Sequence, residues 1–244
     1  MTRVLQWEGC LNVRDLGGVP LEGGGTTRFG VVVRADNVRR LRDLATLAEH
    51  GVTRVVDLRF DDEVAADDPR ELPVDVVHVP LLSFDPAYRE RLFELALASE
   101  PAEYLESSYL DFLERFRENF GRAVQEIARA EGTVCVHCMG GRDRTGLVAA
   151  LLLRLAGVSV EDAAEDYWLS EEALLENHEE WVAAAETAVE VRLRSVFLVA
   201  PRETMVGVLE TLEARHGSVR AYLARAGVPE AELDALATRL RGGT

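Results

Sequence analysis

The feature that most constrains this chain is a segment in which five residues separate Cys138 from Arg144. The residues before it, 133–137, are mostly β-branched and apolar, and those after it, 144–156, form an apolar run that ends at Gly157. This pattern predicts a strand, a glycine-containing loop and a helix, in that order. Such a loop can surround a tetrahedral anion, because its amide N–H groups and those of the first helical turn can point inward.

Strands and helices alternate along the rest of the chain. Short apolar runs predict further buried strands over residues 31–33, 52–58 and 74–82. Helical spacing of apolar residues predicts helices over 41–48, over two segments of 86–130 divided at Pro101, and from Ser159 to Leu240. The alternation predicts an α/β fold with a mostly parallel central sheet flanked by helices, in which ligands bind at the carboxyl ends of the strands.

We expect a single domain over residues 1–244, with a catalytic core over 1–200 and a helical C-terminal extension over 201–244. The formal charge of −16 repels polyanions, so nucleic acid is not an expected partner. The three cysteines make no disulfide framework, and the sequence offers neither a signal peptide nor an apolar stretch long enough for a membrane span. A cytoplasmic location fits best, although secretion without a signal peptide is compatible with the sequence.

The residue types in the loop point to transfer of a phosphoryl group. Cys138, close to a helix N-terminus and to two arginines, is expected to be a thiolate that attacks phosphorus. The planar guanidinium of Arg144 can hold two phosphate oxygens. The hydroxyl of Thr145 would stabilise the sulfur as a leaving group, and His137 would orient the loop. The remaining loop residues are expected to bind the substrate phosphate: Met139, Gly140, Gly141, Arg142 and Gly146.

Hydrolysis of a phosphate ester also needs a general acid that protonates the leaving group. Two aspartates are candidates. Asp143 lies in the loop beside Arg144, and Asp85 lies in a turn that follows a predicted strand. Asp143 is the favoured candidate of the two. The mechanism uses no cofactor, and the scattered histidines make no metal-ligand spacing with the cysteines, so no metal site is expected.

Several motifs of this chain resemble those of the bacterial protein-tyrosine/serine phosphatases, a family that includes phosphoinositide-active members. The segment 137–146 is similar to the family's His-Cys-x-x-Gly-x-Asp-Arg-Thr-Gly loop, and 12–18 to its Asn-Phe-Arg-Asp-Leu-Gly-Gly motif. Residues 57–59 with Glu63 are similar to its Asp-Leu-Arg-x-x-x-Glu segment, and 222–229 also fit. The resemblance spans nearly all of the chain.

The resemblance implies a cysteine-phosphatase fold, a dual-specificity type of activity and a phosphocysteine intermediate on Cys138. Protein phosphotyrosine is the expected substrate, with phosphoserine, phosphothreonine or a phosphoinositide as further options, and phosphate and vanadate are expected ligands. One position departs from the family, which often has lysine where this chain has Arg142. That position is linked in relatives to additional substrate phosphates, and arginine keeps the charge with another geometry.

Other functions and roles stay open at this point. A sulfurtransferase could carry a persulfide on a similar loop, and a catalytically silent module could bind phosphate without turnover. Four charged residues are expected to form a network that supports the end of the sheet: Arg14, Asp15, Asp57 and Arg59. Cys135 is expected to be a packed strand residue, with a protective disulfide to Cys138 as the alternative. Trp181 is expected to lie in the core.

Overall fold

The computed structural model describes residues 2–196 and 198–241 and shows an α/β architecture. Its strands are β1 Arg14–Asp15, β2 Val32–Ala35, β3 Val52–Asp57, β4 Asp75–His78 and β5 Thr133–His137. In the described residues these form one five-stranded sheet in the order β1-β2-β5-β3-β4. Only the β1–β2 pair is antiparallel, so the predicted mostly parallel sheet is confirmed.

Helices account for most of the remaining chain. Those of the first half are η1 Val38–Arg40, α1 Ala45–Glu49, α2 Asp61–Ala65, α3 Pro86–Ala98, α4 Pro101–Arg115 and α5 Arg117–Arg129. Those of the second half are α6 Asp143–Ala156, α7 Val160–Ala183, α8 Ala188–Ser195, α9 Arg202–His216, α10 Val219–Arg225 and α11 Glu230–Arg241. None of the helices in the described ranges has the length and apolar character needed to cross a lipid bilayer.

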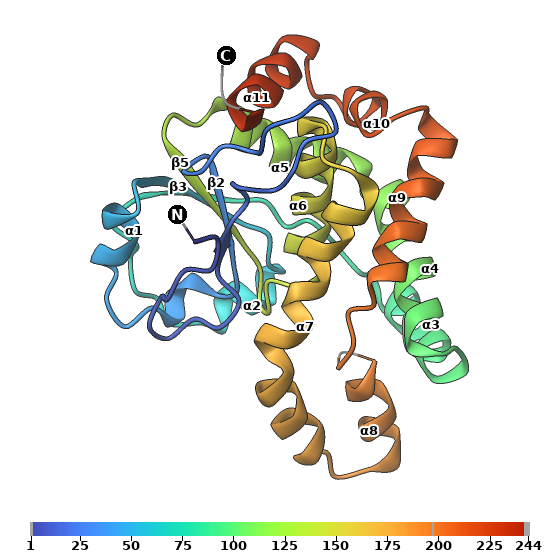
Figure 1. Cartoon of the computed structure of the whole chain (residues 1–244). Coiled ribbons are helices and arrows are strands. Elements are labelled where there is room, and N and C mark those ends of the chain that lie inside the picture. The colour runs from blue at the N-terminus through green and yellow to red at the C-terminus, as the bar shows by residue number, and fades with distance from the viewer. Residues whose placement is uncertain (1, 197, 242–244) are drawn as a thin grey trace.

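Alternate strand residues pack on the two faces of the sheet, as a period of two requires. On one face Val32, Val56 and Val136 join the large core built with α5 and α6. On the other face Val33 and Val55 pack with η1, α1 and the N-terminal segment. Figure 1 shows this layering, with α1 on one side of the strands and α5 and α6 on the other.

Some element boundaries differ from the sequence prediction. The strand expected over 74–82 ends at His78, because Pro80 has no N–H group to continue the ladder. The helical region 86–130 forms three helices and not two, since the backbone turns out of the helix at Phe116, where φ is −110° and ψ is 23°. The helix expected over 41–48 is shorter and begins at Ala45, after a separate 3-10 turn.

The C-terminal helices are part of the main core. Side chains of α9, α10 and α11, such as Met205, Tyr222 and Leu236, are buried in the same cluster as those of α5 and α6. In Figure 1, α7 extends below the body of the molecule together with α8. The division of the chain near residue 200 stays a prediction, but residues 202–241 contribute to the core and are not an appendage to it.

Candidate active site

The strand β5 and the helix α6 place the loop of residues 138–142 at the carboxyl end of the sheet. Ala35 of β2 and Asp57 of β3 are in register with His137, so the ends of three parallel strands meet there. The loop turns tightly at Gly141, where φ is +68°. A Cβ atom at this position would lie 2.5 Å from the carbonyl oxygen of Ala35, so only glycine fits.

The surrounding scaffold holds the loop by its carbonyl groups. The carbonyl oxygen of Cys138 lies 3.2 Å from His137 Nδ1, and that of Met139 accepts the amide of Asn37 at 3.1 Å. The oxygen of Gly140 accepts from Asn12 Nδ2 at 3.0 Å, and that of Gly141 from Arg34 Nη2 at 2.6 Å. Among the described residues, the amide N–H groups of residues 139–141, 143 and 144 have no hydrogen-bond acceptor. Because the carbonyl groups are bonded to the scaffold, these N–H groups remain as donors that an anion could use.

A cavity of about 370 Å³ opens at the loop. Cys138 and Arg144 line it together, although the side chain of Cys138 is only 2% exposed. The opposite wall comes from α7, through Leu174, His178 and Trp181. Trp181 is 43% exposed, so the expectation that it lies in the core was wrong. Sequence spacing alone could not separate a cavity wall from a core position, because both lie on an apolar helix face.

Arg144 is held in place by a carboxylate from a distant segment. Its Nη2 donates to Glu63 Oε1 at 2.9 Å, and its Nη1 donates to Glu63 Oε2. Glu63 also accepts the amide of Phe60 at 2.8 Å, which caps α2, and the Phe60 ring lies 4.7 Å from the guanidinium carbon. Burial lowers the pKa of Arg144, but Glu63 and Cys138 more than offset this, and the net pKa is above the ordinary value. The guanidinium keeps three N–H groups for a ligand.

Asp143 lies at the first position of α6 and shares the cavity with Cys138. Its Oδ1 accepts hydrogen bonds from Arg142 Nε (3.1 Å) and Nη2 (2.7 Å) and from the hydroxyl of Tyr109. Burial raises the pKa of Asp143, but the Arg142 charge and the hydrogen bonds from Arg142 and Tyr109 outweigh burial, so the net pKa is lowered. Asp143 is therefore a carboxylate in the resting site.

Asp85 has a different environment. It is exposed and caps α3, where its Oδ1 accepts the amide of Tyr88 at 2.8 Å. It does not line the cavity that contains Cys138. This geometry favours Asp143 over Asp85 as the proton donor.

Three other residues in or beside the loop have clear positions. The Thr145 hydroxyl is fully buried and has no hydrogen-bond partner in the described part of the chain, so its expected bond to the Cys138 sulfur stays a prediction. His137 is buried, and burial lowers its pKa to about 4, which keeps the ring neutral at neutral pH. Arg142 is 2% exposed, and besides Asp143 it bonds the carbonyl of Val199 at 3.1 Å. Arg142 also lines the cavity, and its contact with additional substrate phosphates stays a prediction.

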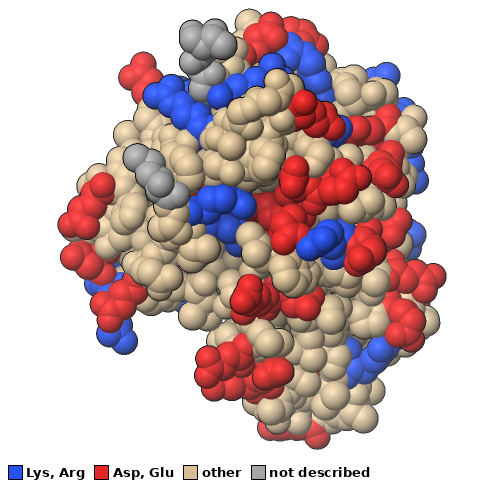
Figure 2. Space-filling view, in the orientation of Figure 1, with Lys and Arg blue, Asp and Glu red and all other residues tan. Residues whose placement is uncertain are grey.

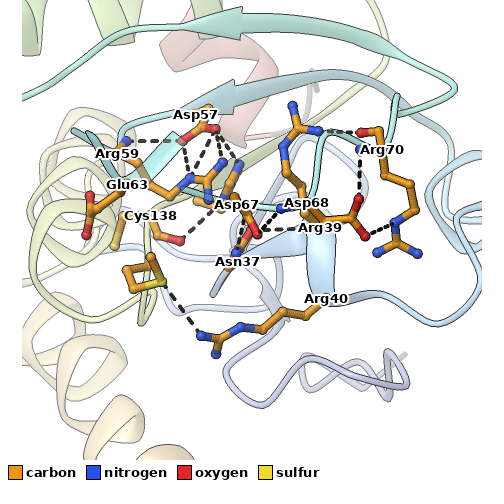
Figure 3. A network of polar contacts seen from close by, with 12 residues as sticks. Asn37, Arg39, Arg40, Asp57, Arg59, Glu63, Asp67, Asp68, Arg70 and Cys138 are labelled. Atoms are coloured by element: carbon orange, nitrogen blue, oxygen red, sulfur yellow. Dashed lines mark hydrogen bonds and ion pairs between the residues drawn. The ribbon is translucent and has the colours of Figure 1, made fainter. Parts of the chain in front are cut away.

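Asp57 and Arg59 belong to a buried polar network under the loop. Arg59 donates to both oxygens of Asp57, at 2.9 Å and 2.7 Å, and also to Asp67, which in turn accepts from Asn37 at 2.9 Å. Figure 3 shows these side chains between Cys138 and the segment that carries Arg70. The network includes Asn37, whose amide binds the loop, so Asp57 and Arg59 support the site without lining its cavity.

A second buried network centres on a residue that sequence reasoning missed. Asp166 of α7, 1% exposed, accepts from Arg14 Nε at 3.0 Å and from Arg34 Nη1 at 2.6 Å, and also from Arg3. Arg34 in turn holds the carbonyl of Gly141. The local sequence around Asp166 has no motif that distinguishes this residue from other acidic residues on helices. Asp15 has a separate role, since it accepts the amides of Gly17 (2.6 Å) and Gly30 (2.8 Å).

Cys135 points away from the cavity. It packs with Val33, Val55 and the half-buried Cys10 on the face of the sheet opposite to the cluster that includes Cys138. Burial raises its pKa well above the ordinary value. The structure therefore supports the packing role expected for Cys135 and gives no support to a disulfide with Cys138.

Comparisons with known proteins agree with this geometry. A model of the tyrosine phosphatase family matches residues 5–242. The chain is 28% identical to the triple specificity protein phosphatase PtpB of Mycobacterium tuberculosis, over 98% of each chain. It is 30% identical to a tyrosine-protein phosphatase of Nostoc commune, over 85% of this chain and 73% of that protein.

Proposed function

The chain belongs to the tyrosine phosphatase family, and we propose that it hydrolyses phosphotyrosine on proteins through a phosphocysteine intermediate on Cys138. The observation that carries the proposal is the loop itself, in which Cys138, Arg144 and Asp143 line one cavity and the amides of residues 139–141, 143 and 144 have no acceptor among the described residues. The Mycobacterium relative is named a triple specificity protein phosphatase, which supports a substrate range wider than phosphotyrosine. Phosphoserine, phosphothreonine and phosphoinositides are the further substrates that we propose. A cytoplasmic location, which three free cysteines favour, is part of the proposal.

In the first step the Cys138 sulfur attacks phosphorus and the bond from phosphorus to the ester oxygen breaks. The loop amides and Arg144 hold the other phosphate oxygens, where charge is redistributed in the transition state. In the molecules in which Asp143 is protonated, it gives that proton to the ester oxygen as the alcohol or phenol leaves, and it becomes a carboxylate. In the second step Asp143 removes a proton from water, which attacks the phosphocysteine and releases inorganic phosphate.

The assay that tests this function is hydrolysis of 4-nitrophenyl phosphate in excess chelator. We expect turnover in the chelator and inhibition by vanadate, because the Cys138 sulfur supplies the nucleophile and the loop fits a phosphorus oxyanion. The two other functions open from the sequence, a sulfurtransferase and a silent phosphate-binding module, are not favoured by the family match. Thiocyanate formation from thiosulfate and cyanide, without phosphate release, would contradict the proposal.

The two candidate acids can be separated by the leaving group. We expect Asp143→Asn to lower kcat by about 10²–10⁴-fold on phenyl phosphate, a poor leaving group, and much less on 4-nitrophenyl phosphate, whose phenolate leaves without a proton. Asp85→Asn is the matched control, and we expect it to have little effect on either substrate because Asp85 caps α3. The reverse pattern would transfer the role to Asp85.

Glu63→Gln should lower kcat/KM by roughly 10–100-fold, because glutamine lacks the negative charge that fixes Arg144. A shift of the Arg144 guanidinium by about 1 Å has effects of this size. The amide oxygen can still accept the Phe60 amide, so the cap of α2 should persist. Asp62→Asn, at an exposed neighbour on the same helix, is the control. Steady-state kinetics with unchanged melting temperature would separate positioning from unfolding, and unaltered kinetics would contradict the role of Glu63.

A further inference from the structure

The hydrogen bonds of Asp143 are unevenly divided between its two carboxylate oxygens. Oδ1 accepts all three: two from Arg142 and one from the hydroxyl of Tyr109. No donor among the described residues contacts Oδ2. The side chain of Asp143 remains 32% exposed on the cavity side of α6. Since an sp² oxygen offers two lone pairs, Oδ1 has no room for a proton and Oδ2 is the oxygen that can carry one.

Tyr109 is itself fixed by a second tyrosine. The Tyr109 side chain is 1% exposed, and its hydroxyl lies 2.9 Å from that of Tyr167. A carboxylate only accepts, so the single hydroxyl hydrogen of Tyr109 points to Asp143, and Tyr167 must donate to Tyr109. Gly146 permits this arrangement, because a Cβ atom there would lie 3.0 Å from the ring of Tyr167. The result is a buried chain from Tyr167 through Tyr109 to Asp143, in which each bond polarises the next.

We propose that Tyr109 is a positioning residue for the general acid: its hydroxyl, held by Tyr167, occupies Oδ1 of Asp143, so that Oδ2 carries and releases the catalytic proton. The inference rests on the proposed function of Asp143. In the step concerned the Oδ2–H bond breaks and the proton goes to the ester oxygen. That oxygen keeps the electron pair of its broken bond to phosphorus, while the bond from the Cys138 sulfur to phosphorus forms.

Titratable or charged groups from three segments face Asp143: Arg142 and Arg144 from the loop and α6, Tyr104 and Tyr109 from α4, and Tyr167 and His178 from α7. Burial raises the pKa of Asp143, and the bond from Tyr109 is one of the interactions that bring it below its ordinary value. Loss of the Tyr109 hydroxyl should therefore raise this pKa. An acid acts while protonated, so the basic limb of the pH–rate profile should move to higher pH.

The test is Tyr109→Phe, assayed for kcat/KM against pH with phenyl phosphate and 4-nitrophenyl phosphate. We expect the basic limb to move to higher pH and kcat at the optimum to fall roughly tenfold on phenyl phosphate only, a fraction of what a general acid supplies. Tyr222→Phe is the matched control, since it removes a buried hydroxyl that donates to the Leu113 carbonyl at 2.8 Å, away from Asp143. It should leave the profile unchanged.

A double variant, Tyr109→Phe with Asp143→Asn, shows whether Tyr109 acts through Asp143. We expect it to match Asp143→Asn alone on phenyl phosphate. A further loss in the double variant, equal losses on both substrates, or an unmoved profile would overturn the role of Tyr109 alone. If the loss of kcat in Asp143→Asn did not depend on the leaving group, Asp143 would not be the general acid, and the inference about Tyr109 would fail with it. If Tyr109→Phe fails to fold, Tyr167→Phe should move the basic limb in the same direction, and an unmoved limb would overturn the proposal.

Discussion

Replacing Cys138 with serine should abolish hydrolysis of aryl phosphates, with kcat lower by about 10⁴-fold or more, the scale seen when a nucleophile is removed from an enzyme. A serine hydroxyl stays protonated at neutral pH and is a weak nucleophile unless an adjacent base activates it. The change is confined to one atom, so the loop amides and Arg144 should still bind the oxyanion. Stopped-time phosphate release and calorimetric titration with inorganic phosphate would measure both properties.

Cys10→Ser is the matched control for this prediction. Cys10 is half-buried on the opposite face of the sheet, with its sulfur 3.7 Å from the carbonyl of Asn37. We expect near-normal kinetics, because the hydroxyl can make the same contact. Residual turnover of Cys138→Ser within about tenfold of the parent would show that another group is the nucleophile, and the mechanism would have to be abandoned.

Asp166→Asn should destabilise the protein by about 3–5 kcal/mol, the scale expected when one partner of a buried ion pair is removed. Arg14 and Arg34 are 3% and 1% exposed, and without the carboxylate their charges would remain buried without compensation. Urea unfolding would measure the change in the free energy of unfolding. Asp234→Asn, in an exposed pair with Arg220, is the control and should cost less than about 1 kcal/mol.

The pH dependence of this effect has a definite sign. Burial raises the pKa of Asp166, but the three arginines more than offset it, so the folded pKa lies below the unfolded value near 3.9. A group of this kind stabilises the fold above its unfolded pKa, and the stabilisation is lost as the pH falls toward the folded pKa. The difference between the parent and Asp166→Asn should be constant above about pH 5 and narrow below about pH 4. A difference that stays constant at low pH would contradict the role of the ionised carboxylate.

The sequence predicted best what is local along the chain. Cys138, Arg144 and Gly141 lie within one loop, and the strand before it and the helix after it have strong apolar patterns. The parallel sheet followed from the same alternation. By contrast, the partner of Arg144 is Glu63, which lies 81 residues away, and the partner of Arg34 is Asp166, 132 residues away. Such pairings depend on tertiary packing, which residue spacing does not record.

The wall formed by α7 illustrates the same limit. Figure 2 shows acidic side chains in the lower part of the molecule, where Figure 1 places α7 and α8. Which side chains of the helix meet the loop depends on its crossing over α6. His178 and Trp181 could therefore be recognised only from the structure.

The hydrogen bonds to the loop carbonyls make the order of the loop depend on the folding of distant segments. The four partners belong to the N-terminal segment, β2, the turn after β2 and the end of β5, and one of them, Asn12, contacts a residue 128 positions away. Ordering a loop from remote parts of a chain is entropically costly until those parts have assembled. A nascent or partly denatured chain would therefore contain Cys138 without the ordered loop that binds phosphate. We expect catalytic activity only once the sheet has assembled.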